Sequence, residues 1–213
     1  TTYNDDAVQI SSVSDGGYVI TWVGITADGT SDIFVQKYDA SNNAVGTTKQ
    51  LYGISGSYND TVPQITATSD GGYVVSWQGM TSSTGYDIFM QKYDASNNAV
   101  GAIKQLYGIS GNNNDYSPQI TATNDGGCII TWQGGTGTNL SDIFSQKIVF
   151  DPVIIDYTNS GVTGVNASNV SIVNSYLTTT TIASTNVNTT AKVQALVDSV
   201  NKIIALADGT TLN

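Results

Sequence analysis

Histidine, arginine and glutamate are absent from this 213-residue sequence, whose 17 acidic residues are all aspartate and whose 7 basic residues are all lysine. Without histidine the chain cannot form a Ser-His-Asp or Cys-His catalytic site, and it has no imidazole metal ligand. Without arginine it has no bidentate guanidinium clamp for phosphate or carboxylate. The formal net charge of −10 opposes binding to nucleic acids and anionic membranes, so we expect neither as a partner.

Cysteine and long apolar runs are also scarce. Cys128 is the single cysteine, so no intrachain disulfide can form, and its apolar strand pattern predicts a small buried side chain. No apolar stretch approaches the roughly 18 residues of a membrane span, so we expect no membrane insertion. The chain begins at Thr1 without a basic and apolar leader, and we expect a mature product or a segment of a longer protein.

An internal repeat dominates the sequence. The Asp-Gly-Gly turn, a tryptophan and an Asp-Ile-Phe motif each occur three times at a spacing of 55 residues, and the first two copies match at 36 of 55 positions. The third copy lacks the last hairpin and strand of the others. The repeats cover residues 3–57, 58–112 and 113–150.

Each full repeat has the pattern of four short strands. In the second copy they are expected at 64–68, 73–78, 87–93 and 103–107, where apolar and polar residues alternate. Aspartate and glycine between them suit tight hairpin turns. A unit of four antiparallel strands cannot bury its apolar face alone and must stack on its neighbours. We therefore expect a mainly β region of tandem propeller-like or β-prism-like repeats over residues 1–151.

The pattern changes after Asp151, and residues 152–213 are expected to form a small α-helical module or a linker to a further domain. Apolar residues recur at helical spacing from Val193 to Ala207 and define a helix over 189–207, while a shorter helix is expected after Ser168. Few charges surround the longer stripe, which indicates that this helix docks on another surface.

The segments 56–60, 70–74, 87–94 and 104–106 together resemble the bacterial β-propeller repeat, and they also resemble repeats of large secreted surface and adhesin-like proteins. The segment 156–207 resembles short helical modules of giant bacterial surface proteins. This resemblance implies a propeller-like fold, although propellers usually close with about four to eight blades and this chain has fewer than three complete repeats. It carries over no catalytic residue.

The sequence offers candidates for a calcium site and for sugar stacking, and each has an alternative explanation in the fold. Asp28 and Asp32 lie in a loop that faintly resembles an oxygen-rich calcium loop, so calcium is a possible ligand, although the other repeats lack the first aspartate. The three tryptophans could stack on sugars, but their register with strand residues favours a buried core. The Asp-Gly-Gly aspartates favour turn chemistry, and the repeated lysines favour solvated or paired positions.

The preferred functional interpretation is a non-catalytic structural or interaction segment of a bacterial extracellular surface protein, such as a surface-layer, fibre or adhesin building block. The alternative is a lectin-like, carbohydrate-binding module with repeated sites. We expect no enzyme, an extracellular or cell-surface location, and as partners other copies of the chain, flanking domains of a longer protein, or glycans. An unpaired strand edge and an apolar helix stripe suggest assembly contacts at Asp142, Phe144, Phe150, Leu196, Val200, Ile203 and Ile204.

Overall fold

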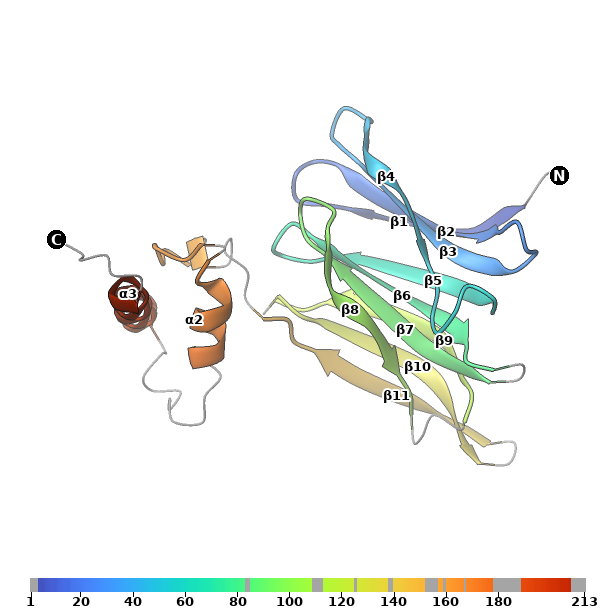
Figure 1. Cartoon of the computed structure of the whole chain (residues 1–213). Coiled ribbons are helices and arrows are strands. Elements are labelled where there is room, and N and C mark those ends of the chain that lie inside the picture. Colours follow the sequence, from blue (N-terminus) through green and yellow to red (C-terminus); the bar gives the residue numbers. More distant parts are fainter. Residues whose placement is uncertain are drawn as a thin grey trace. The chain divides into compact units, whose positions relative to one another are not determined.

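The computed structural model describes residues 4–82, 85–108, 113–124, 126–137, 140–151, 157–158, 160–166, 168–177 and 189–207. The chain divides into two compact units, Thr1–Val149 and Phe150–Asn213. The first unit is built of strands, and the second contains the helices (Figure 1). The expected mainly β architecture with a small C-terminal helical region is therefore confirmed.

Three antiparallel sheets make up the first unit, and within each sheet every strand pairs with its sequence neighbour. The first sheet contains β1 (Asp5–Ser12), β2 (Tyr18–Ile25), β3 (Ser31–Tyr38) and β4 (Ala44–Leu51). The second contains β5 (Asp60–Ala67), β6 (Tyr73–Met80), β7 (Tyr86–Tyr93) and β8 (Ala99–Leu106). The third contains β9 (Asp115–Ala122), β10 (Cys128–Gly137) and β11 (Leu140–Ile148), so the truncated repeat gives a three-stranded sheet.

The Asp-Gly-Gly motif turns the chain between the first two strands of a sheet. Gly16 has a φ of 83°, which favours glycine, and the Asp15 carboxylate accepts a hydrogen bond from the Gly17 N–H at 2.9 Å. A Cβ atom on Gly17 would lie 2.2 Å from the Tyr38 carbonyl oxygen. The turn chemistry expected of this motif is present at Asp15 and Asp70, while Asp125 lies outside the described residues.

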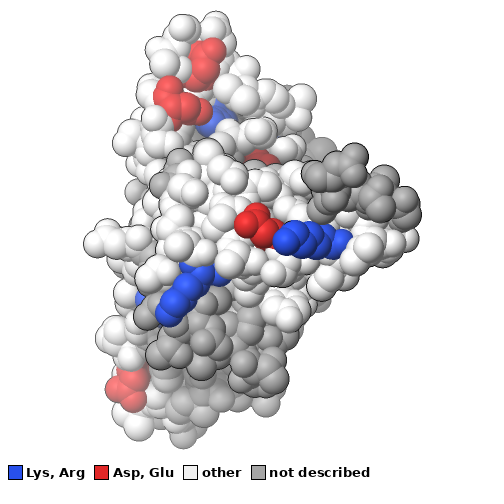
Figure 2. All heavy atoms as spheres, turned by 90° about the vertical axis from the view of Figure 1, so that its left-hand side faces the viewer, with Lys and Arg blue, Asp and Glu red and all other residues white. Residues whose placement is uncertain are grey.

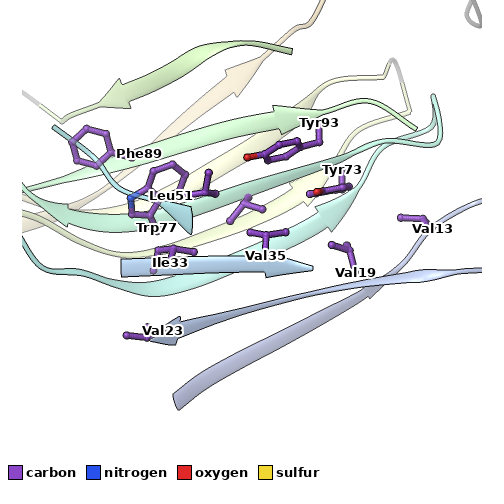
Figure 3. Packing of buried hydrophobic residues seen from close by; sticks show 11 residues of the cluster. Val13, Val19, Val23, Ile33, Val35, Leu51, Tyr73, Trp77, Phe89 and Tyr93 are labelled. Carbon is purple, nitrogen blue, oxygen red and sulfur yellow. The ribbon is translucent and has the colours of Figure 1, made fainter. Parts of the chain in front are cut away.

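The sheets stack face to face, with the second sheet between the first and the third (Figure 1). Aliphatic side chains of the first sheet, including Val19, Ile33 and Val35, form a core with aromatic side chains of the second, including Trp77 and Phe89 (Figure 3). The innermost strands β1, β5 and β9 are neighbours. This stacking of two four-stranded sheets and one three-stranded sheet around their first strands is the arrangement of propeller blades.

Each inner strand has a non-glycine residue with a positive φ at the same position of the repeat. The values are 52° at Ala7, 53° at Val62 and 54° at Ser117, and in β1 and β5 the pairing register shifts at this point. A bulge bends a strand and increases its twist. The bulge therefore separates the first residues of each inner strand from the regular hydrogen-bonded ladder. The first residue of each of these strands is an aspartate.

The C-terminal unit contains α2 (Val170–Leu177) and α3 (Thr190–Ala207). Val173 of α2 and Val197 of α3 are buried in one small core, which also includes Tyr157 and Val162. The apolar spacing that predicts the longer helix therefore serves packing within this unit. Among the described residues, no helix is both long and apolar enough to cross a membrane.

Candidate functional site

Two exposed tyrosines follow the last strand of the first two sheets at the same position of the repeat. Tyr52 is 42% exposed and Tyr107 is 52% exposed, and we call this pair the junction tyrosines. Each comes directly after a buried leucine, Leu51 or Leu106, so strand alternation turns the tyrosine outward. The connection to the next sheet starts at these residues, and the junction tyrosines therefore mark the two boundaries between sheets.

A buried aspartate fixes the glycine that follows each junction tyrosine. The Gly53 N–H donates to the two carboxylate oxygens of Asp60 at 3.1 and 3.2 Å, while the Trp77 Nε1–H donates to Asp60 Oδ1 at 2.9 Å. Asp60 begins β5, and its carboxylate thus joins the end of one sheet to the tryptophan of the next. The backbone next to Tyr52 is held in place by this contact.

The same arrangement recurs at the second boundary. The Gly108 N–H donates to Asp115 Oδ2 at 3.0 Å, and the Trp132 Nε1–H donates to Asp115 Oδ1 at 3.2 Å. A Cβ on Gly108 would lie 2.8 Å from the Phe144 ring, so the glycine allows close approach of the two sheets. Two consecutive boundaries therefore present the junction tyrosines on equivalent, anchored backbone.

Burial changes the ionisation of the two anchoring aspartates. It raises the pKa of Asp60 to about 7, although the Gly53 and Trp77 hydrogen bonds oppose the increase and the negative charge of Asp32 adds to it. Burial likewise raises the pKa of Asp115 to about 6, with the nearby Asp87 contributing in the same direction. These carboxyl groups titrate close to neutrality because the boundary between the sheets excludes water.

The loop segments next to Tyr52 at the first boundary carry polar groups. The ring lies against Gly56, with 3.7 Å from Tyr52 Cδ1 to a Cβ built on that glycine. The Thr30 hydroxyl oxygen lies 2.9 Å from the Gly56 carbonyl oxygen and 2.8 Å from Asp28 Oδ1, so its single hydrogen can be donated to either acceptor. Asn59 is exposed, and its side-chain oxygen accepts the Ser31 N–H at 3.0 Å. An aromatic face thus lies near a hydroxyl group and close to a carboxylate.

The second boundary repeats the amide contact and adds aromatic surface. The Asn114 side-chain oxygen accepts the Tyr86 N–H at 3.0 Å, which is the counterpart of the Asn59 contact. The Tyr86 and Tyr116 rings lie 5.5 Å apart between centroids in a tilted pair. The boundaries between the sheets therefore carry a repeated set of tyrosines and asparagines, which we call the junction face: Tyr52, Asn59, Tyr86, Tyr107, Asn114 and Tyr116.

The calcium candidates lie in different environments. Asp28 is exposed, and its carboxylate closes a turn with the Thr30 N–H at 3.3 Å. Hydrogen bonds from the Thr26 hydroxyl, the Thr30 hydroxyl and the Thr30 N–H, in that order, lower the pKa of Asp28. Asp32 is buried, accepts the Gln50 side-chain N–H at 2.5 Å, and has its pKa raised by desolvation. Within the described ranges no three cysteine or aspartate side chains gather in a way suited to a metal ion, and calcium binding stays a prediction.

Two of the repeated tryptophans are buried as their register favours, whereas Trp22 is only half-buried, and two of the repeated lysines are paired with aspartates. Trp77 and Trp132 are buried, and Trp77 stacks on Phe89 at 6.0 Å (Figure 3), so neither can serve as a sugar platform. Lys37 pairs with Asp15 at 2.8 Å, and Lys92 pairs with Asp70 at 2.6 Å. The junction tyrosines, which sequence reasoning missed, carry the exposed aromatic surface instead.

The predicted assembly residues divide between the two units. Asp142 is exposed on β11, whereas Phe144 and Phe150 are half-buried. Val200 belongs to the core of the helical unit, with Leu196 and Ile204 packed against that core. Ile203 is exposed on α3. Of the four helix residues, Ile203 is therefore the one fully presented to a partner.

Charge is sparse on the surface as well as in the composition. Figure 2 shows one face on which a few lysines and aspartates lie among many uncharged residues. Only 11% of the residues are charged, so hydroxyl, amide and aromatic groups make up much of the polar surface. Such a surface suits an uncharged polar ligand better than a polyanion.

Among solved structures, the chain shows a weak structural likeness to a known protein. No protein-family model matches the chain, and no curated protein matches it. The chain is similar to the crystal structure of an endo-arabinase from Bacteroides thetaiotaomicron, with a TM-score of 0.46 and 13% sequence identity. The alignment covers 68% of this chain and 56% of that one. The antiparallel sheets themselves agree with the repeated strand pattern of the sequence, while no family model supports adhesin-like repeats.

This comparison corrects two predictions made from the sequence. A non-catalytic structural segment and the absence of enzyme activity were expected, but the similar protein is an endo-arabinase, a glycoside hydrolase. Those predictions are therefore wrong on this finding, and the carbohydrate-binding alternative fits it better. The repeat had favoured a structural interpretation because residues that recur with a fold are explained by folding alone. At this TM-score the likeness assigns no catalytic residue to the chain.

Proposed function

We propose that the three-sheet unit binds a neutral carbohydrate on its junction face, with the junction tyrosines Tyr52 and Tyr107 as stacking platforms. The observation that carries this proposal is the repetition of one exposed tyrosine at equivalent, anchored positions of two successive sheets. Folding alone does not require an aromatic ring to remain exposed at both boundaries. A repeated ligand contact gives these rings a function.

The chemistry of the junction face suits a sugar ring. A tyrosine offers a rigid apolar face with a polar hydroxyl at its tip, and it brings large contact area at low conformational cost. The C–H groups of a sugar pack on such a face, while its hydroxyl groups exchange hydrogen bonds with side chains. Asn59 uses its oxygen on the Ser31 N–H, which turns its NH₂ group into the part that a sugar hydroxyl would meet.

The negative net charge of the chain favours neutral carbohydrates over acidic ones. A formal net charge of −10 repels uronic acids and sulfated sugars, and Asp28 adds a negative charge near Tyr52. Lys37 and Lys92 are engaged with aspartates within the fold. A neutral pentose or hexose polymer is therefore the ligand class that we propose. Such polymers are found outside cells, which supports the extracellular location that we propose for this protein.

Calorimetric titration of the 213-residue protein with a panel of soluble polysaccharides tests the proposal. We expect at least one neutral polymer to bind and an acidic polyuronate not to bind. Replacing both junction tyrosines, Tyr52→Ala with Tyr107→Ala, should weaken binding at least tenfold because the stacking surface is removed. Tyr176→Ala, at a half-exposed tyrosine of the helical unit, is the matched control and should leave binding unchanged.

Thermal melts of the variants establish that they remain folded. Binding that is unaffected by the double substitution, or binding restricted to acidic polymers, would contradict the proposal. The same mixtures should be assayed for new reducing ends, because the comparison with a glycoside hydrolase makes cleavage of the bound polymer a relevant activity to measure.

A further inference from the structure

The two ends of the stack of sheets expose surfaces that are buried between the sheets. Each sheet has a leading face, directed toward the preceding sheet, and a trailing face, directed toward the next. The second sheet uses both faces, because it lies between the first and the third (Figure 1). The leading face of the first sheet and the trailing face of the third have no neighbouring sheet within the described residues.

The exposed fraction of one isoleucine in each repeat shows whether the trailing face of that sheet is covered. Ile33 and Ile88 occupy equivalent positions, and each is 0% exposed because the next sheet covers it. Ile143, at the same position of the third sheet, is 77% exposed. The side chain type and its register are unchanged, so the difference arises from the missing neighbour. The trailing face of the third sheet is thus built to be covered.

A lysine of each repeat also differs in burial between the covered and the uncovered sheet. Lys37 is buried and donates from Nζ to the Ala95 carbonyl oxygen of the second sheet at 2.6 Å. Lys147 lies at the equivalent position of the third sheet and is exposed. The first boundary between sheets therefore combines an apolar contact with a lysine-to-carbonyl hydrogen bond, and the third sheet carries the equivalent isoleucine and lysine.

The first sheet carries the complementary half of this interface. Trp77 and Phe89 of the second sheet stack at 6.0 Å and, with Ile65, pack against the first sheet. Their counterparts Trp22 and Phe34 stack at 5.8 Å but are only half-buried. Ile10, the counterpart of Ile65, is 66% exposed. The aromatic side of the interface is therefore preformed and open.

We propose that the leading face of one copy of this chain binds the trailing face of a second copy, head to tail, in the register of the internal sheet boundaries. Every copy carries the isoleucine and lysine of the trailing half on its three-stranded third sheet and the aromatic leading half on its first sheet, and the first internal boundary shows how these residues pack together. Ile143 of one copy would pack beside Trp22 and Ile10 of the other. Lys147 would donate to the Ala40 carbonyl, the counterpart of Ala95.

Two reciprocal contacts of this kind close a ring. Each chain contributes three sheets, so a pair of chains gives six, within the range of about four to eight blades in closed propellers. A heterologous contact that closes in this way produces a defined oligomer, whereas one that does not close produces a filament. We commit to the closed dimer as the expected assembly.

Sedimentation velocity of the 213-residue protein over a range of concentrations tests this inference. We expect a dimer, and each of the substitutions Ile10→Lys and Ile143→Lys should weaken it at least tenfold. Both side chains are exposed, so the variants should fold. Ile54→Lys, at an exposed isoleucine of the first connection between sheets, is the matched control and should still form dimers.

Mixing the two single variants gives the decisive result. The copy with Ile10→Lys retains its trailing face, and the copy with Ile143→Lys retains its leading face. An equimolar mixture should therefore form a heterodimer through one intact contact at concentrations at which each variant alone stays monomeric. A parent protein that stays monomeric at every concentration would overturn the inference. It would do so whatever else covers these two faces. Loss of dimers with Ile143→Lys but not with Ile10→Lys would also overturn it.

Discussion

Replacing Asp60 with asparagine should change how the stability of the protein depends on pH. Burial raises the pKa of this carboxyl group from 3.8 to about 7 in the folded protein. A raised folded-state pKa gives stability that is fully present below the unfolded-state pKa and is lost as the pH rises through the folded-state value. A shift of about 3 units at 1.36 kcal/mol per unit corresponds to about 4 kcal/mol between pH 4 and pH 8.

Asp60→Asn removes this titration while keeping the size of the side chain and an oxygen acceptor for the Gly53 and Trp77 N–H groups. Urea unfolding, followed by tryptophan fluorescence, gives the free energy of unfolding of parent and variant at each pH. The parent's stability relative to the variant should fall by about 4 kcal/mol as the pH rises from 4 to 8. Asp5→Asn, the exposed counterpart in the first sheet, is the control and should show no such fall.

A stability difference between the parent and Asp60→Asn that stays constant with pH would refute the reasoning. A difference that grows in favour of the parent as the pH rises would refute it more strongly, because the carboxyl group would then be stabilised in its charged form. The same experiment with Asp115→Asn should give a smaller fall, since burial raises the pKa of Asp115 only to about 6.

Four other substitutions test the packing of the first unit. Lys92→Met leaves Asp70 as a buried uncompensated charge and should cost about 3–5 kcal/mol in urea unfolding; Lys37→Met should cost less because its partner is half exposed. Cys128→Ala should cost no more than about 1–2 kcal/mol, and the native thiol, buried and with its pKa raised to about 11, should resist alkylation until the protein unfolds. Ala7→Gly should raise stability by up to about 1 kcal/mol in thermal melts, because the positive φ of Ala7 is strained.

The repeat made the sheets predictable from the sequence, and tertiary packing explains where the boundaries differ. Strands were expected at 64–68 and 103–107, whereas β5 begins at Asp60 and β8 at Ala99. The early start of β5 arises from the bulge at Val62, which breaks the alternation of side chains that a strand pattern relies on. The longer helix was expected at 189–207, and α3 covers Thr190–Ala207, because its apolar spacing has no such interruption.

The candidate site was less predictable because its signals depend on which side chains the next sheet covers. The tryptophans were the obvious aromatic candidates, yet stacking buries Trp77 and leaves Tyr52 exposed. The recurrence of aspartate at positions 5, 60 and 115 was a signal that could have identified the anchoring carboxylates. Its meaning appears only when Gly53 and Trp77 converge on Asp60 from different sheets.

The measurement that tests the proposed function most directly is an NMR titration of protein labelled at the tyrosine rings with the neutral polysaccharide that binds best. The account predicts that ring signals of Tyr52 and Tyr107 shift together as the polymer is added, while the Tyr176 signal of the helical unit stays in place. Shifts confined to the tyrosines of the opposite turns, such as Tyr18, or no shift at either junction tyrosine while the polymer binds, would contradict carbohydrate binding on the junction face.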